Sequence, residues 1–207
     1  MLAHLSLTEI ALLIIFIVVS LVIHEFMHAY VGHLLGDTTA HEQGRMTLNP
    51  LSHIDPFMTI ILPAITLITI GFPILAAKPV PFNPERVRYG EYGAAMLAAA
   101  GPFSNLLLAI IAGLCAKAFG YAQVDQHSIL GTFMLLNVAL FVFNILPIPP
   151  LDGSRVLYAF APEPVQDFMR TIEPYGLFII FGLLVVASVG FGSFLGTLEQ
   201  DIYNLLP

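Results

Sequence analysis

Long apolar runs separated by short polar segments dominate the chain. A helix needs roughly 20 apolar residues to cross a bilayer, so this pattern predicts several membrane helices, packed as a single transmembrane domain over residues 1–207. The longest apolar runs are residues 10–23, 57–70, 94–116, 129–146 and 177–191.

Breaks between these runs set the expected helix boundaries. The first helix should begin at Ser6 or Leu7 and end at Leu35, with Gly36 as its C-cap. Prolines exclude regular helix from residues 76–93 and from "NILPIPPLDG". The other expected helices are residues 93–117, 128–146 and 175–197, together with a short amphipathic piece near 154–170.

The predicted fold class is an all-α integral membrane protein with about four to five transmembrane helices. Residues 54–75 are apolar but broken by Pro63 and Pro73, so this segment either crosses the membrane or re-enters it. Residues 45–48 could form a short strand before Pro50.

Composition agrees with a membrane protein. The 207 residues are 57% hydrophobic and 10% charged, whereas a soluble domain carries about 25% charged residues. The net charge of −7 is thinly spread and does not suggest a nucleic-acid partner. The first run lacks the basic flank of a signal peptide, and the single Cys115 cannot form an intramolecular disulfide.

The basic residues test the topology. If residues 54–75 span the membrane, five basic residues lie on one side and two on the other. If these residues re-enter the membrane, six basic residues lie on one side and Lys117 alone lies on the other. The positive-inside rule favours the second arrangement, which puts the N-terminus outside and residues 37–92 and 148–171 in the cytoplasm. The seven are Arg45, Lys78, Arg86, Arg88, Lys117, Arg155 and Arg170.

The segment "HEFMH", residues 24–28, places ionisable side chains inside an apolar run. Each costs at least about 2.5 kcal/mol near the bilayer centre on insertion scales. On a helix, His24 and His28 project about 40° apart and can bind one metal ion. Glu25 lies beside them, where a zinc peptidase needs a base for the attacking water. His33 points the opposite way and is not an expected ligand.

A catalytic zinc usually has three protein ligands, so one must come from elsewhere. Asp152 follows the point where Pro147, Pro149 and Pro150 break a helix. Non-helical backbone at membrane depth is tolerated where it is buried in protein or lines a water-filled cavity. Asp152 is therefore a candidate third ligand; an ordinary surface loop is the alternative.

Three motifs together resemble the site-2 protease family of intramembrane zinc metalloproteases. "HEFMH", "AAAGPFSN" and "NILPIPPLDG" match, in order, the family pattern H-E-x-x-H, G-P-x-x-N and N-x-x-P-x-P-x-L-D-G. "GRMTLNPLSHIDP" and "AKPVPFNP" further resemble a compact bacterial branch without PDZ or CBS domains. The resemblance covers residues 20–160.

The resemblance implies specific roles for the motif residues. Asn105 could donate to a developing oxyanion or form an interhelical hydrogen bond. Asn144 would lie near the site, where it is a candidate for substrate binding or for fastening the unwound backbone around Pro147–Pro150. Gly101 is expected to allow close helix packing. The implied zinc ligands, one Zn²⁺ per chain, are His24, His28 and Asp152, with Glu25 as the general base.

The proline-rich stretch Lys78, Pro79, Val80, Pro81 and Phe82 is a candidate substrate-binding segment. The family's topology favours a re-entrant 54–75 and suggests that residues 41–49 and 78–84 form small strands beside the cleft. An unwound substrate could then add to the exposed edge. A plain proline-rich connector is the alternative.

The expected function is hydrolysis of peptide bonds in or near the membrane segments of single-span proteins. The resemblance places the chain in the cell membrane, a bacterial inner or plasma membrane, with its site toward the cytoplasm. One alternative is a metal-binding transporter, which would need ionisable groups strung across several helices. Another is an inactive homologue that binds membrane proteins, which the intact Glu25 argues against.

Overall fold

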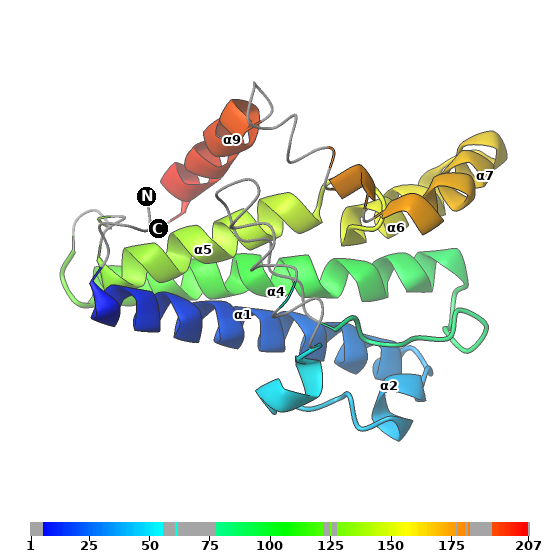
Figure 1. Ribbon diagram of the computed structural model, residues 1–207, viewed down its shortest axis with the longest axis horizontal. Coiled ribbons are helices and arrows are strands. Elements are labelled where there is room, and N and C mark those ends of the chain that lie inside the picture. Colours follow the sequence, from blue (N-terminus) through cyan, green and yellow to red (C-terminus); the bar gives the residue numbers. More distant parts are fainter. Residues whose placement is uncertain are drawn as a thin grey trace.

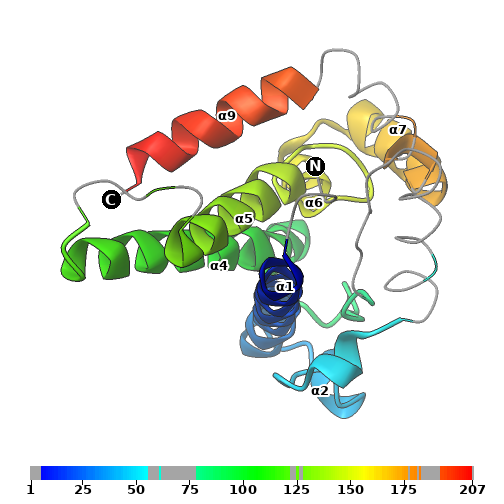
Figure 2. The same ribbon diagram turned by 60° about the vertical axis from the view of Figure 1, so that its left-hand side comes forward.

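Three long apolar helices form the body of the molecule. In the computed structural model, α4 (Glu91–Ala118) packs against both α1 (Leu7–Leu34) and α5 (Ile129–Asn144). It runs antiparallel to both, and α1 crosses it at an angle (Figures 1 and 2). The structure describes residues 6–55, 61, 78–121, 125, 128–176, 178–180, 182 and 192–206.

Local signals in the sequence set the ends of these helices. Ser6 and Glu9 form a capping box at the start of α1. Beyond its other end, Gly36 adopts a φ of 101°, which favours glycine. The Ser128 side chain caps α5 by accepting from the Gly131 N–H. The expected first, second and third helices are therefore confirmed to within two residues.

Shorter helices flank this body. α6 (Asp152–Phe160) packs on α4, and α9 (Gly192–Leu205) packs on α5. The described residues also form α2 (Thr39–Glu42), α7 (Glu163–Ile172) and the 3₁₀ turns η2 (Pro50–His53) and η4 (Glu173–Tyr175).

Two expected boundaries are wrong. The amphipathic piece near 154–170 is divided into α6 and α7, because Pro162 drives Ala161 into extended backbone with a ψ of 145°. The last helix was expected over 175–197; residues 176, 178–180 and 182 are helical, but α9 continues beyond 197 to Leu205. Most of 177–191, and nearly all of 54–75, lies outside the described residues, so the re-entrant segment and the number of spans stay predictions.

The small strands are also wrong: no strand occurs in the part of the chain that the structure describes. Residues 41–49 hold the end of α2 and a series of turns, and residues 78–83 have no regular secondary structure. Pro79 and Pro81 have no N–H for a ladder. The neighbouring backbone groups bond instead to side chains, as described below.

The long helices present apolar side chains outward. α1 and α4 are both long and apolar enough to cross a membrane. Within the most apolar 18-residue stretch of each helix, 22% of α1 and 50% of α4 is buried inside the molecule. The core helix of a soluble protein would be mostly buried. Exposed apolar side chains line α1 and α4, namely Ile14, Ile15, Val18, Val19, Phe103, Leu107, Ile111 and Leu114. Such an apolar surface is suited to contact with the hydrocarbon core of a membrane.

Candidate metal centre

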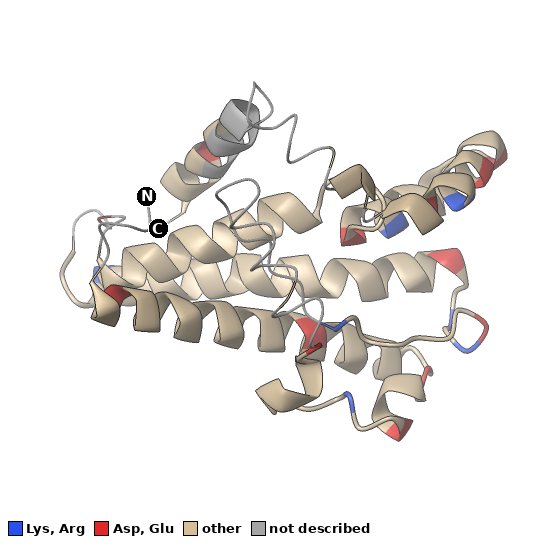
Figure 3. Cartoon of the chain, in the orientation of Figure 1, with Lys and Arg blue, Asp and Glu red and all other residues tan. Residues whose placement is uncertain are grey.

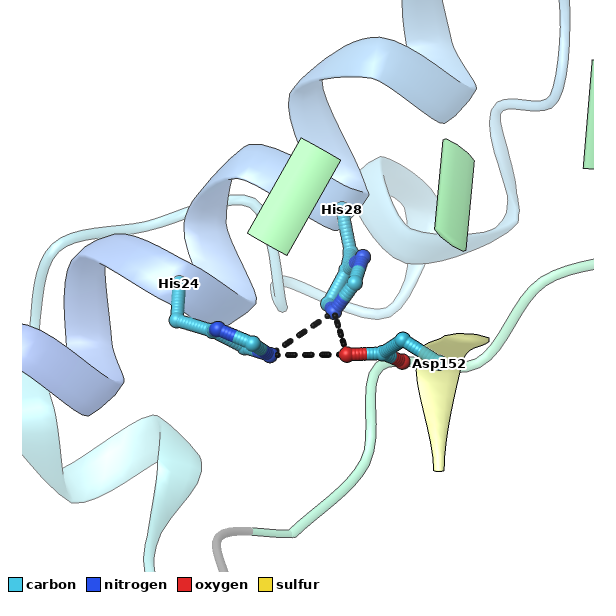
Figure 4. A group of neighbouring side chains, drawn as sticks. All are labelled: His24, His28 and Asp152. Atoms are coloured by element: carbon cyan, nitrogen blue, oxygen red, sulfur yellow. Dashed lines mark hydrogen bonds and ion pairs between the residues drawn. The ribbon is translucent and has the colours of Figure 1, made fainter. Parts of the chain in front are cut away.

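Two imidazoles and one carboxylate meet beside α1. His24 and His28 are one helical turn apart, and their Nε2 atoms lie 3.1 Å from each other. The Asp152 Oδ2 atom lies 3.1 Å from the Nε2 of His24 and 3.3 Å from that of His28. All three side chains point toward one another, although Asp152 is 128 positions from His24 (Figure 4).

Hydrogen bonds to the outer ring nitrogens set the tautomers of both histidines. The Nδ1–H of His24 donates to Asn105 Oδ1 at 2.6 Å, and the Nδ1–H of His28 donates to the Leu97 carbonyl at 2.8 Å. Both partners are acceptors, so each neutral ring carries its proton on Nδ1. The two Nε2 lone pairs therefore face Asp152 and each other.

This donor set fits zinc. Two imidazole nitrogens and one carboxylate oxygen converge, an arrangement that a bound cation would stabilise. With metal–nitrogen bonds of about 2.0–2.1 Å, the ligand atoms of a tetrahedral zinc lie about 3.3 Å apart, close to the separations of 3.1–3.3 Å seen here. Three protein ligands would leave the fourth position open, as catalytic zinc sites require.

Asp152 reaches the histidines because the chain turns sharply after α5. Pro147, Pro149 and Pro150 prevent the helix from continuing. A Cβ on Gly153 would stand 2.0 Å from the Ile145 carbonyl oxygen, so glycine is needed for this close approach. Asp152 then lies in the first turn of α6, where the helix dipole favours a negative charge.

Gly101 gives the imidazoles their space. A Cβ at this position of α4 would lie 2.4 Å from the Nε2 of His28 and 2.6 Å from that of His24. Such distances are far inside van der Waals contact. The sequence predicted Gly101 as a helix-packing residue, and the structure places it directly against the ligand atoms.

A buried chain of amides stands behind His24. Asn105 is fully buried, and its Nδ2 donates to Asn137 Oδ1 at 3.0 Å and to the Ser20 carbonyl at 3.5 Å. Asn137, also fully buried, donates in turn to the Phe133 carbonyl at 2.9 Å. These bonds connect α1, α4 and α5 at the level of the site.

Glu25 faces a different part of the chain. Its Oε2 accepts from the Val80 N–H at 3.1 Å, in the proline segment, residues 78–84. The Arg45 Nη2 donates to the carbonyls of Lys78 at 2.7 Å and Pro79 at 3.4 Å. The proline segment therefore runs past the histidine helix at the level of Glu25.

The other predicted site residues have their contacts outside the cluster of His24, His28 and Asp152. Asn144 donates to the Leu140 carbonyl within its own helix, at 2.9 Å. The Arg155 guanidinium lies over the ring of Phe82, with the Arg155 Cζ 5.8 Å from the centroid of that ring. Pro81 is half-buried beside it. His33, which was not an expected ligand, packs near His41, with ring centroids 5.4 Å apart.

Sequence reasoning missed Asn137 and Arg45. Asn137 had a usable signal, because it is a polar residue in the middle of the 129–146 apolar run, and polar groups at membrane depth are usually functional. The sequence assigned Arg45 only to the charge count and to a short strand over residues 45–48. Its contact with the proline segment depends on tertiary structure.

Apolar helices that carry a two-histidine, one-carboxylate cluster define a membrane-associated metallopeptidase type of site. Residues 120–187 match peptidase family M50. The chain is 38% identical over 186 residues to the Bacillus subtilis (strain 168) protein named "Putative zinc metalloprotease YwhC", covering 86% of this chain and 81% of that one.

Two further relatives carry the name "Putative zinc metalloprotease Rip2". The protein of Mycolicibacterium smegmatis is 31% identical over 173 residues, covering 82% of this chain and 65% of the relative. That of Mycobacterium tuberculosis (strain H37Rv) is 31% identical over 172 residues, covering 81% and 63%. No solved structure matches the chain. The chain belongs to peptidase family M50, the site-2 protease family.

Proposed function

We propose that the chain is an intramembrane zinc endopeptidase that cuts single-span membrane proteins in or near their membrane segments. His24, His28 and Asp152 hold one Zn²⁺, and Glu25 is the general base. The observation that carries this proposal is the convergence of two imidazole nitrogens and one carboxylate oxygen within 3.1–3.3 Å, beside a helix, α1, whose outer surface is apolar.

The chain's own groups supply the proton transfers. When bound, zinc acts as a Lewis acid that polarises the scissile carbonyl and makes water a stronger acid. The Glu25 carboxylate takes a proton from the attacking water and delivers it to the leaving amine. The Val80 N–H restrains one oxygen of this carboxylate at 3.1 Å.

Asn105 acts in this proposal as a positioning residue. Both donors of its amide are directed at Asn137 and at the Ser20 carbonyl, and its oxygen holds His24. This arrangement favours the interhelical role over donation to an oxyanion. It fixes the ring and tautomer of His24, as partners behind a metal ligand usually do.

The proposal also states how deep the site lies in the membrane and which side of the membrane it faces. At 1.5 Å per residue, His24 and His28 lie roughly 9–15 Å from the end of α1, inside a hydrocarbon core of about 30 Å. Most charged residues of the described part of the chain lie toward that end (Figure 3). The positive-inside rule assigns this end to the cytoplasm of the cell that makes the protein.

The substrate must present extended backbone, because helical carbonyls are already hydrogen-bonded. The proline segment is our candidate docking element for that backbone. A peptide lying along it would pass Val80 and so bring its carbonyl carbon beside Glu25.

Reconstitution in liposomes with a panel of single-span membrane proteins tests this function. Wild type should cleave at least one substrate and bind one zinc, whereas Glu25→Gln should bind zinc and lose activity by about 100-fold or more. Glu85→Gln, which changes an exposed carboxylate beyond the proline segment, is the matched control. Zinc-loaded wild type that cleaves nothing in a broad panel would favour an inactive binding protein, and active Glu25→Gln would exclude the assigned base.

A further inference from the structure

We propose that Arg45 is a positioning residue for hydrolysis: it holds the proline segment so that the Val80 N–H stays on the Glu25 carboxylate. This inference rests on the proposed peptidase function. It concerns a residue outside the metal ligands and their immediate hydrogen-bond partners.

The guanidinium of Arg45 is buried against backbone. The residue is 7% exposed, and among the described residues it forms no ion pair. Its Nη2 donates to the carbonyls of Lys78 and Pro79, whereas its buried Nε has no hydrogen-bond partner among the described residues. A buried cation is costly unless it is hydrogen-bonded. Both bonds that this guanidinium makes go to the backbone of residues 78 and 79, so Arg45 acts as a restraint on that backbone.

The fold aims Arg45 at this position. After α2 ends, Gly44 takes a φ of 65° and its N–H donates to the His41 carbonyl at 3.0 Å. The Arg45 N–H then donates to the Ala40 carbonyl at 2.8 Å. This closed turn reverses the chain and directs the side chain inward.

The proline segment transmits that restraint to the base. Lys78 is held on both sides, because its N–H donates to the His53 carbonyl at 2.9 Å and its own carbonyl accepts from Arg45. Pro79 and Pro81, on either side of Val80, have fixed φ angles. Residue 80 therefore has little freedom once residue 78 is fixed, and its N–H meets Glu25 at 3.1 Å.

Three variants in liposomes test the role of Arg45. Arg45→Met keeps side-chain length without the charge, and Arg45→Lys restores a donor for the two carbonyls. Arg86→Met is the matched control, because Arg86 is exposed and pairs with Glu42. The readouts are kcat and KM on a cleaved substrate, zinc content, and hydrogen exchange of peptides that contain Val80.

Arg45→Met should lower kcat by about 10- to 100-fold, the range typical of supporting partners at such sites, with KM and zinc content unchanged. Exchange at Val80 should rise, Arg45→Lys should recover much of kcat, and Arg86→Met should match wild type. Unchanged kcat in Arg45→Met, or a loss of zinc that Arg45→Lys does not reverse, would overturn the inference. Wild type that cleaves nothing would instead overturn the peptidase function.

Discussion

At the scale of single residues, the site depends on what surrounds the ligands as much as on the ligands themselves. The Leu97 carbonyl and the Asn105 amide orient the two imidazoles, and Gly101 leaves the space in which their Nε2 atoms meet. Each of these contributions comes from α4. The histidine helix alone could not present both rings in the right tautomer.

Gly101→Ala should abolish zinc binding without unfolding the protein. The added methyl would stand 2.4 and 2.6 Å from the two Nε2 atoms, so the rings must swing away from Asp152. Zinc content after dialysis and circular dichroism measure the two effects. Ala100→Gly, a change of one methyl at the preceding position of α4, should keep its zinc and lose about 1 kcal/mol of helix stability. Full zinc occupancy in Gly101→Ala would contradict the assigned ligand geometry.

Asn105→Ala should weaken zinc binding by about 10- to 100-fold. The change leaves the Nδ1–H of His24 buried without its 2.6 Å acceptor, so the ring is free to turn or change tautomer. Competition with a chelator measures the affinity. Ser104→Ala, which removes a bond to the Gly101 carbonyl on the same helix, is the comparison. Wild-type affinity combined with a large loss of kcat would restore the oxyanion role for Asn105.

At the scale of elements, the sequence predicted what depends on local signals. Apolar runs predicted α1, α4 and α5 to within two residues, with Ser6 and Gly36 marking the ends of α1. The spacing in "HEFMH" placed both histidines on one face. Asp152 could be nominated because few acids follow a helix break at membrane depth. These features need no knowledge of how the helices pack.

Features that depend on packing could not be predicted in this way. The bond between His24 and Asn105 joins residues 81 positions apart, and the one between Glu25 and Val80 spans 55. Helix rotation and register decide such contacts, and periodicity specifies neither. The expected strands failed for a related reason, because Arg45 and Glu25 took up backbone groups that a ladder would have used.

Asp37 links the end of α1 to the proline segment and should make stability depend on pH. Burial raises the pKa of this carboxyl, but hydrogen bonds from Thr39 and from the Asn83 N–H outweigh it, so the pKa lies below its ordinary value of 3.8. The stabilisation is therefore present above about pH 4 and is lost as the pH falls through the lowered pKa.

Asp37→Asn should accordingly lower the thermal midpoint in detergent at pH 7, and the gap to wild type should narrow as the pH falls toward 2. Glu85→Gln, an exposed change just beyond the same segment, should leave the midpoint unaltered at both ends of the range. A gap that is equally wide at every pH would mean that the carboxylate charge is not what stabilises this junction.

At the scale of the whole molecule, the charges are distributed unevenly along the helix axes. Most basic residues lie toward the end of the molecule where α1 ends and α4 begins, while Lys117 lies in the last turn of α4, at its opposite end (Figure 3). The same charged end carries the proline segment and α6, which supplies Asp152. The positive-inside rule therefore predicts both the orientation of the chain and the side from which water reaches the site.

Cysteine labelling tests this orientation, since Cys115 is the single natural cysteine. In a Cys115→Ser background, Lys117→Cys should react with a membrane-impermeant maleimide on intact cells. Glu85→Cys should react after the membrane is opened, because its exposed position lies at the proposed cytoplasmic end. The reverse pattern would invert the topology and place the metal cluster near the outer surface. Labelling of both positions on intact cells would mean that the segment between them does not cross the membrane.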